Sequence, residues 1–258
     1  METKSLGFIG GGRITWIFLQ AFVNKKAIFD PISVFDTNQE TLTALKQKFP
    51  FIREAQSARE CAQKDIVFMA LPPTEIAEIL ELIKDSVSSQ TIFISLAPQI
   101  TIDRISEKLG VVQQIVRLIP NSTSIINQGY NAACFSARMS EIQKWYVLEM
   151  LQLLGHTFET SEEKLEGYCL LSCLLPSYFW FQWHELDAIG SQFGLSQAEC
   201  RESIYETLNA ALNTMYRSGM KPEEVMDLIP VKPIGEHEEQ IKAIYKANLT
   251  DFYQKIKP

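Results

Sequence analysis

The chain has 258 residues, with 24 Lys and Arg against 31 Asp and Glu, so its formal charge is −7. An acidic chain without a basic stripe is repelled by nucleic acids and by anionic membranes, which argues against both partners. No apolar run approaches the roughly 18 residues of a membrane-spanning helix. Glycines follow the N-terminus where a signal peptide needs its apolar centre. We therefore expect a soluble, cytoplasmic, folded protein.

The cysteines agree with that compartment. They are Cys61, Cys134, Cys169, Cys173 and Cys200. None forms a CxxC pair, and no His or third Cys lies near Cys169 and Cys173 in sequence. We therefore expect free thiols in a reducing compartment and no metal site.

Short apolar runs alternate with helical patterns over the first part of the chain. We expect strands at 6–9, 32–35, 66–71, 91–96 and 112–118. The helical patterns cover 13–23, 74–84 and 102–109. Two more helices are predicted to open with capping boxes, Thr37 with Glu40 and Ser57 with Glu60. This alternation predicts an α/β fold with a parallel, doubly wound sheet of the Rossmann type.

The alternation of short apolar runs with helical patterns stops after about residue 138. A helix is expected over 141–154, followed by a last strand at 156–160 and then by helices alone. Those helices are predicted over 165–193, with an interruption at Pro176, then after Ser196, from Pro222 and from about Glu238. The predicted organisation is a dinucleotide-binding domain at 1–160 and an all-helical domain at 161–258.

The first long helix of the second part is unusually aromatic. Its aromatic residues are Tyr178, Phe179, Trp180, Phe181 and Trp183. Consecutive aromatics cover every face of a helix, which a surface helix does not carry. The helix is therefore either central to its own domain or buried in a dimer interface.

The segment between the first strand and the first helix carries the strongest local signal. It contains G-x-G at Gly10 and Gly12, with Thr15 in place of a third glycine. In such turns the first glycine allows a tight bend and the second lets the backbone approach a pyrophosphate. Free N–H groups at the helix start, at Arg13 and Ile14, then bind the phosphates. The alternative is a glycine-rich turn that merely packs.

Asp36 ends the second strand, where an acidic residue accepts hydrogen bonds from the adenosine ribose of NAD. No Arg or Lys follows immediately, which favours NAD(H). Thr37 and Asn38, with Arg13 beside the phosphate loop, keep NADP(H) open. The alternative for Asp36 is capping of the next helix.

Three later strands also end in candidate cofactor residues. Ala70, Leu71 and Pro72 follow the third strand, Ala97 follows the fourth, and Asn121 follows the fifth. Ligands of open α/β sheets bind beyond the carboxyl ends of the strands. We expect these residues to flank the ribose and nicotinamide, with the Asn121 amide near the carboxamide or the substrate.

Several segments follow one another in a characteristic order. They are GFIGGGRIT at 7–15, SLAPQIT at 95–101, VRLIPNSTSIINQG at 116–129 and PSY at 176–178. This order resembles the pyrroline-5-carboxylate reductase family over nearly the whole chain, with an N-terminal domain of the type found in F420-dependent NADP oxidoreductases. The resemblance implies a Rossmann domain followed by a helical dimerisation domain.

The resemblance also implies an activity. It implies an NAD(P)H-dependent oxidoreductase acting on a small molecule, with hydride transfer to the C=N bond of a cyclic imine acid. It further implies a homodimer, or a higher homo-oligomer, through the C-terminal helices. The active site then forms between the cofactor and the partner's helical domain.

The segments that correspond to the family's substrate-binding residues depart from the family pattern. G-S-G-P is replaced by CLLP at 173–176, and S-P-G-G-[TA]-T by KPIGEH at 232–237. Glu236 has the wrong sign for holding a carboxylate, which leaves the substrate open. His237 and His184 are candidate proton donors, and Lys232 and Glu236 are candidate substrate contacts. Their alternative is a solvated surface role, because reduction of a protonated imine needs no strong acid.

Two further readings stay open. An F420-type NADP oxidoreductase shares the N-terminal domain, but its C-terminal part is smaller. A non-catalytic dinucleotide-binding protein would account for the altered substrate loop.

Overall fold

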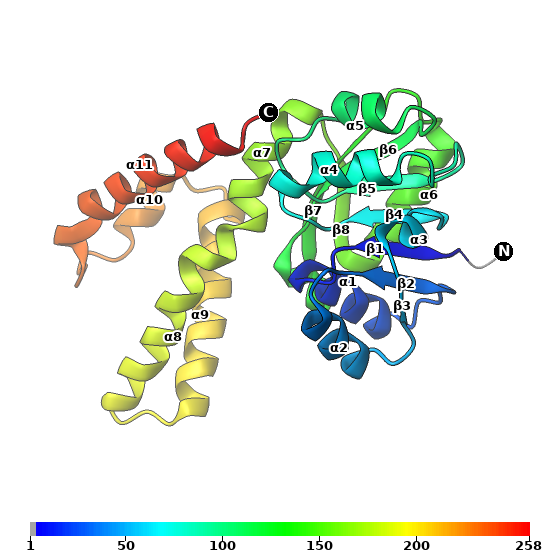
Figure 1. The fold of residues 1–258 in the computed structure, drawn as a ribbon. Coiled ribbons are helices and arrows are strands. Elements are labelled where there is room, and N and C mark those ends of the chain that lie inside the picture. The colour runs from blue at the N-terminus through cyan, green and yellow to red at the C-terminus, as the bar shows by residue number, and fades with distance from the viewer. Residues whose placement is uncertain (1–3) are drawn as a thin grey trace. The chain divides into compact units, whose positions relative to one another are not determined.

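A computed structural model describes residues 4–258, and these form one sheet and two groups of helices (Figure 1). The sheet has eight strands in the order β3-β2-β1-β4-β5-β6-β7-β8. Its strands are β1 (Leu6–Ile9), β2 (Ile32–Phe35), β3 (Arg53–Glu54), β4 (Ile66–Met69), β5 (Ile92–Ser95), β6 (Gln114–Ile119), β7 (Gly129–Phe135) and β8 (Gly155–Glu159). All neighbouring pairs are parallel except β6 and β7. The predicted α/β fold is confirmed.

Helices cover both faces of the sheet. One face packs against α1 (Arg13–Asn24), α2 (Gln39–Lys48) and α6 (Glu141–Leu151). The other packs against α3 (Ala58–Ala62), α4 (Pro73–Ile83) and α5 (Ile102–Leu109). The central strands β1 and β4 are buried on both faces, and their sequences are continuous apolar runs.

Aromatic contacts show how the strands alternate between these faces. Phe8 of β1 stacks on Phe68 of β4 at 4.7 Å between ring centroids, and Phe18 of α1 meets Phe68 edge-on. Their neighbours Ile9 and Val67 point into the opposite layer. Because side chains alternate between the two faces along each strand, one sheet contributes to two hydrophobic cores.

The predicted strands are found within two residues of their expected ends, but β3 and β7 were not predicted. The predicted start of α2 is also wrong in one detail. Asn38, not Thr37, caps the helix, since its Oδ1 accepts hydrogen bonds from the N–H groups of Glu40 and Thr41. The helix starts one residue later because the Asn38 N–H donates to Asp36 Oδ1 at 2.8 Å.

The chain divides into two compact units. One runs to Leu174 and includes Tyr253–Pro258, and the other comprises Leu175–Phe252. The boundary expected near residue 160 therefore falls inside the first unit. The physical reason is that Leu165 and Cys169 are buried in the core beside α4 and α5, together with Ile256.

A short helical segment leads up to the division. It consists of a 3₁₀ turn (Glu162–Lys164), α7 (Leu165–Tyr168) and a π-helical turn (Cys169–Cys173). Pro176 lies in the first turn of the next helix and does not interrupt it. The break in the predicted helix over 165–193 is the π-helical turn instead.

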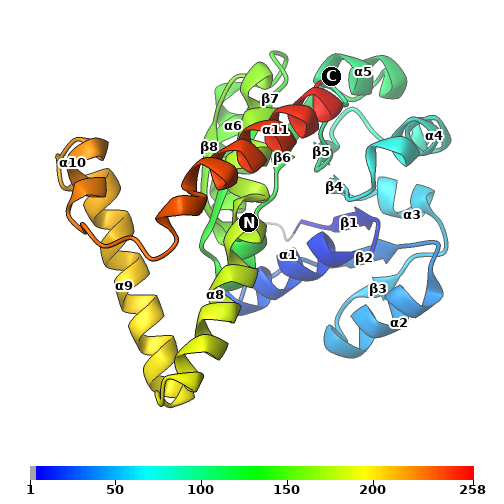
Figure 2. The ribbon, with the colours of Figure 1, turned by 90° about the vertical axis from the view of Figure 1, so that its left-hand side faces the viewer.

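The second unit is helical, as predicted. It contains α8 (Leu175–Gln192), α9 (Gln197–Arg217), α10 (Pro222–Asp227), a 3₁₀ turn (Gly235–His237) and α11 (Glu238–Ile256), which continues into the first unit. A capping box of Ser196 and Glu199 opens α9, as predicted. Helices α8 and α9 form a hairpin whose turn includes Gly194 (Figure 2).

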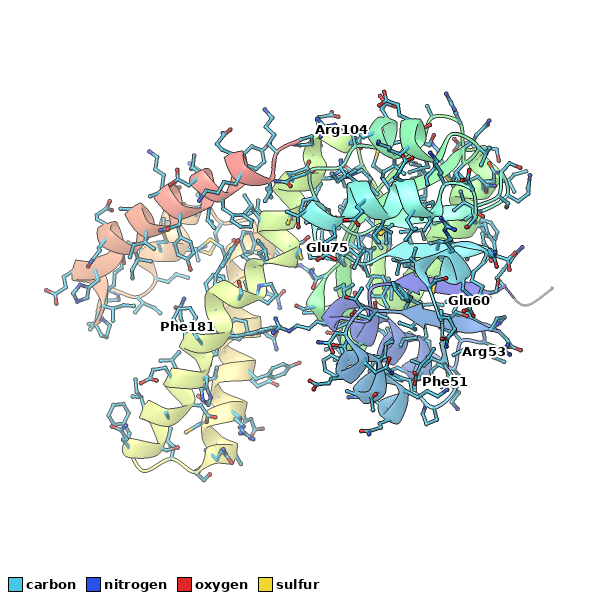
Figure 3. The ribbon with its side chains drawn as sticks, viewed as in Figure 1. Phe51, Arg53, Glu60, Glu75, Arg104 and Phe181 are labelled. Atoms are coloured by element: carbon cyan, nitrogen blue, oxygen red, sulfur yellow. The ribbon has the colours of Figure 1, made fainter. Side chains whose placement is uncertain are left out.

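The aromatic helix is not the buried centre of this unit. No residue of α8 is buried, and Trp180 is 50% and Phe181 68% exposed. Figure 3 shows the Phe181 ring projecting away from the helix. Of the two roles expected for this helix, burial within its own domain is not observed.

No helix among residues 4–258 has the length and hydropathy to cross a membrane.

A buried ion network holds the α7 segment against the sheet. The guanidinium of Arg117, on β6, donates to Glu162 at 2.9 Å and to Glu166 at 2.6 Å. Glu162 also accepts the N–H of Ile102, the first residue of α5. Glu166 accepts the N–H of Gln99, in the loop before α5. Removing one partner from such a network costs about 3–5 kcal/mol, because it leaves an uncompensated buried charge.

Candidate cofactor-binding site

The turn from β1 into α1 has room only for glycine at its first position. Gly10 has φ +104°, and a Cβ there would lie 2.3 Å from the carbonyl oxygen of Ala70. The Gly10 N–H donates to Phe35 O at 2.8 Å, which joins the ends of β1 and β2. Thr15, at the third glycine position of the motif, donates its hydroxyl to Gly10 O at 2.6 Å. This bond ties the tight turn to the helix that follows.

Gly12 caps α1, and the space around it is open. A Cβ at Gly12 would meet no atom within 4 Å, and no side chain caps the helix. The first N–H groups of a helix have no intrahelical acceptor and carry a partial positive charge. Arg13 is exposed and Ile14 half-buried at this start. The predicted residues therefore form an open helix start that suits a pyrophosphate.

Asp36 connects this turn to the end of β2. Its Oδ2 accepts the Gly11 N–H at 2.7 Å, and its Oδ1 accepts the Asn38 N–H. Asp36 therefore supports the turn and the start of α2 without being the cap of that helix. A carboxylate has about four acceptor positions, so Asp36 can still accept hydrogen bonds from ribose hydroxyls. Thr37 follows it and is exposed.

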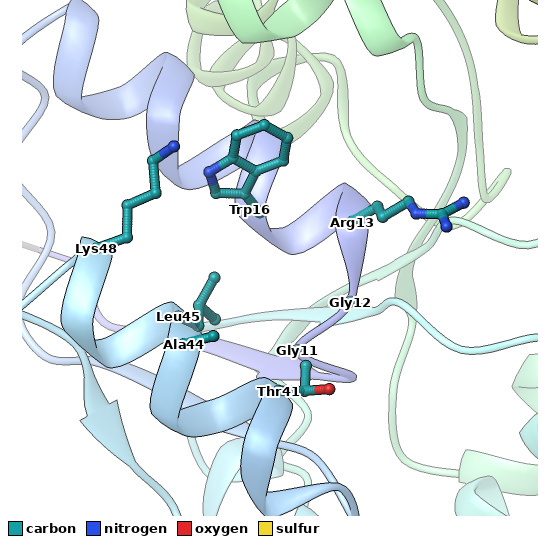
Figure 4. Close-up of a pocket in the computed structure, with 8 residues that line it drawn as sticks. All are labelled: Gly11, Gly12, Arg13, Trp16, Thr41, Ala44, Leu45 and Lys48. Carbon is teal, nitrogen blue, oxygen red and sulfur yellow. The ribbon is translucent and has the colours of Figure 1, made fainter.

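A cavity of about 400 Å³ lies beside the turn, between α1 and α2 (Figure 4). Its lining residues are Gly11, Gly12, Arg13, Trp16, Thr41, Ala44, Leu45 and Lys48. The Lys48 ammonium lies 4.3 Å from the centroid of the Trp16 ring. The cavity combines an aromatic wall with two cations in an acidic protein, which suits an adenosine carrying phosphate.

Trp16 and Lys48 line this cavity but were not predicted from the sequence. Trp16 follows Arg13 by three positions, and Thr41, Ala44 and Lys48 follow the helical spacing of three and four. That spacing places each set on one helix face. It does not reveal that the two faces meet, because their meeting depends on how α1 and α2 pack on the sheet.

Other predicted cofactor residues end neighbouring strands at the same edge. The Ala70 N–H donates to Ile9 O at 2.8 Å, and the Leu71 side chain lies 3.1 Å from the Cβ position of Gly10. Pro72 caps α4, and Ala97 follows β5 two residues after its last strand position. The structure therefore brings the residues that end β4 and β5 to the edge that carries the glycine turn.

Asn121 ends β6 at this edge, but its amide has partners within the first unit. Its Nδ2 donates to Ser172 O at 3.0 Å, and its Oδ1 accepts the N–H and hydroxyl of Thr123. The side chain thus holds the π-helical turn against the end of β6. Its contact with a cofactor stays a prediction.

The candidate catalytic residues lie in the second unit, whereas the predicted cofactor residues lie in the first. His184 is exposed on α8. His237 Nε2 lies 3.4 Å from Glu236 Oε1, with both side chains exposed. Lys232 Nζ lies 3.9 Å from Glu238 Oε1, a partner that sequence analysis missed. The structure brings the loop residues together in pairs, and their catalytic roles stay predictions.

His156 is the third histidine of the chain. The His156 ring stacks with Tyr130 and Phe158 on β7 and β8, which is a packing role. No group of three or more His, Cys, Asp or Glu side chains within residues 4–258 is arranged to hold a metal ion.

Comparisons with known proteins agree with this geometry. Residues 5–99 match the family described as NADP oxidoreductase, coenzyme F420-dependent. The pyrroline-5-carboxylate reductase of Corynebacterium melassecola is 22% identical over 224 residues, covering 86% of this chain and 83% of that protein. The enzyme of that name from Escherichia coli (strain K12) is 23% identical over 228 residues, covering 88% and 84%.

Solved structures show the same fold. Plasmodium falciparum pyrroline carboxylate reductase with NADP bound has a TM-score of 0.78 at 21% identity, covering 99% of this chain and 96% of that one. The 1-pyrroline-5-carboxylate reductase of Streptococcus pyogenes has a TM-score of 0.75 at 20% identity, covering 98% and 96%.

The fold and the glycine turn define a protein of the Rossmann, dinucleotide-binding class. The chain shares its fold with solved pyrroline-5-carboxylate reductases, is similar in sequence to enzymes of that name over most of its length, and over residues 5–99 matches the NADP oxidoreductase family.

Two glycine substitutions separate the fold of this turn from its function. Gly12→Ala should lower the melting temperature only slightly, because its Cβ meets nothing and only the poorer N-cap preference of alanine opposes it. It should weaken dinucleotide affinity at least about tenfold, since the Cβ occupies the approach to the backbone. Gly10→Ala should cost about 1–3 kcal/mol of stability or more, because positive φ and the Ala70 carbonyl both oppose it.

Thermal unfolding and titration with NADH and NADPH measure the two effects. Unchanged affinity in a folded Gly12→Ala variant would remove this turn from the cofactor site.

Proposed function

We propose that the chain is an NAD(P)H-dependent reductase that transfers hydride to the C=N bond of a small cyclic imine acid. One observation carries the proposal: the open start of α1 at Gly12, at the edge where β1, β2, β4 and β5 all end. The correspondence with pyrroline-5-carboxylate reductases over more than 80% of both chains supports the reaction type.

The residues at this edge fit the predicted cofactor. The N–H groups from Gly12 to Ile14 bind the pyrophosphate, and Asp36 accepts hydrogen bonds from the adenosine ribose. Ala70, Leu71, Pro72 and Ala97 flank the ribose of the nicotinamide half. When bound, the reduced nicotinamide supplies the hydride, and the protein supplies orientation and a proton route.

Asp36 also sets the cofactor preference in this proposal. A carboxylate beside the ribose repels a 2′-phosphate, so NADH is preferred. Arg13 and Lys48 line the neighbouring cavity and offset part of that repulsion, so NADPH binds as well.

The substrate is held from the helical unit. A protonated imine accepts hydride without a strong acid, so a polar group has only to keep the nitrogen protonated and in place. His237 or His184 serves as that proton source, and Lys232 and Glu236 contact the polar groups of the substrate. Glu236 has the wrong sign for holding a carboxylate, so Lys232 is the contact for the substrate carboxylate.

The proposal includes a homodimer. The exposed aromatic rings of α8 need a partner, and the helical unit of a second copy provides an equivalent apolar face. The partner's helices then complete the substrate site over the cofactor edge.

The contribution of Asp36 is tested by cofactor affinity. In Asp36→Ala, NADH binding should weaken about tenfold and NADPH binding should weaken less or improve, because the repulsion of the 2′-phosphate is lost. Asp65→Ala is a matched control, since Asp65 also accepts a backbone N–H, from Ser5, but at the opposite end of the strands. Equal NADH affinity in wild type and Asp36→Ala would remove Asp36 from the site.

Turnover tests the reaction itself. The wild-type protein should oxidise proline or thioproline, or reduce the corresponding imines, with a change in NAD(P)H absorbance. His237→Gln or His184→Gln should lower kcat about 10²-fold if that side chain supplies the proton. His156→Gln, a stacked ring on β8, is the control that should not. Cofactor binding without turnover across imines and amines would favour a non-catalytic dinucleotide-binding protein.

The molar mass of the protein in solution tests the proposed dimer. Sedimentation equilibrium should give at least twice the 29.4 kDa of one chain. Phe181→Asp should shift the mass toward one chain, because a buried carboxylate opposes the interface. Ile142→Asp, 80% exposed on α6, is the matched control. A wild-type monomer at micromolar concentration would contradict the proposal.

A further inference from the structure

The π-helical turn at Cys169–Cys173 places two thiols on one side of the chain. The Leu174 N–H donates to Cys169 O at 2.9 Å, the i→i+5 bond that defines such a turn. A turn closed in this way holds more residues than the 3.6 of an α-helix. Residues four apart therefore lie nearly one above the other, which brings Cys169 and Cys173 together.

The two thiols differ in their surroundings. Cys169 is 8% exposed and packs in the core with Leu165 and Ile256. Cys173 is only partly buried and lies at the margin of that core. The pair therefore consists of one partly exposed residue at the margin of the core and one buried within it.

A hydrogen bond between the thiols separates their acidities. The Cys169 thiol donates to the Cys173 sulfur, which lowers the pKa of Cys173 and raises the pKa of Cys169. Elsewhere in the first unit, burial raises the pKa of Cys61 to about 12 and that of Cys134 to about 11. Because the thiolate is the nucleophile, Cys173 is the reactive member of the pair.

We propose that Cys173 and Cys169 form a peroxide-sensitive thiol pair that closes to a reversible disulfide. The Cys173 sulfur attacks one oxygen of hydrogen peroxide, the O–O bond breaks, and water leaves, so that Cys173 becomes a sulfenic acid. The Cys169 sulfur then attacks the Cys173 sulfur, the S–O bond breaks, and a second water leaves. Two thiols lose two electrons and two protons in total, and the peroxide is reduced to two waters.

The bridge would form at a structurally sensitive position. Ser172, between the two cysteines, accepts the hydrogen bond from Asn121 at the end of β6. Helix α8 begins at Leu175, two residues after Cys173. A disulfide needs its Cβ atoms about 3.5–4.5 Å apart, so its closure would fix the spacing of Cys169 and Cys173 across the π-helical turn.

Thiol counting on the full chain tests the proposal. The reduced, unfolded protein should show five thiols, the number in the sequence. After treatment of the folded protein with a slight excess of hydrogen peroxide, two thiols should be lost, with a mass decrease of two hydrogens. A reductant should restore both. Peptide mapping with cleavage between Cys173 and Cys200 should place the bridge within the turn.

Single substitutions test the order of the two steps. Cys169→Ser removes the resolving thiol, so the Cys173 sulfenic acid should persist and be trapped by dimedone. Cys173→Ser should give no adduct at the buried Cys169. Cys200→Ser, which removes a buried thiol of the second unit, should still lose two thiols on oxidation. Circular dichroism checks that each variant folds.

Three results would overturn the proposal. They are an unchanged count of five thiols, a bridge that involves another cysteine or another chain, and dimedone labelling of Cys169 in place of Cys173. Should a serine variant fail to fold, the peptide map of the oxidised wild-type protein decides alone.

Discussion

The close approach of two backbone segments at Gly10 is the constraint on which the candidate site depends. The turn leaves no room for a side chain, because the Ala70 carbonyl lies where a Cβ would stand. That contact lets the Gly10 N–H reach Phe35 O and the Ala70 N–H reach Ile9 O. Three strand ends are thereby joined at one edge. The same tight turn places the start of α1, with its open Gly12, at that edge, which gives the edge free N–H groups of the kind that suit a phosphate.

Much of the fold follows from the sequence, and the exceptions have physical reasons. Strands buried on both faces are continuous apolar runs, and glycine marks the turn after β1. Strand β7 was missed because it carries a buried Asn131 among small residues, and that amide finds its partners only in the folded chain, at Ser124 and Thr157. Strand β3 was missed because it is two exposed residues held by pairing with β2.

The candidate site was predictable where it depends on local chemistry. Gly10, Gly12 and Asp36 follow from the order of strand, turn and helix. The Trp16–Lys48 contact does not, since it requires α1 and α2 to pack on one face of the sheet. The network around Arg117 joins partners 45 and 49 residues away. No local pattern reveals such distant pairs, although they fix the segment that leads to the helical unit.

A crystal structure with NADH and a proline analogue bound would test the central claim most directly. The account predicts the pyrophosphate against the N–H groups at Gly12, Arg13 and Ile14, with the ribose hydroxyls on Asp36. It predicts the analogue between the nicotinamide and the helices of a second copy. A dinucleotide bound away from the Gly10–Gly12 turn, or an analogue site enclosed by one chain alone, would contradict it.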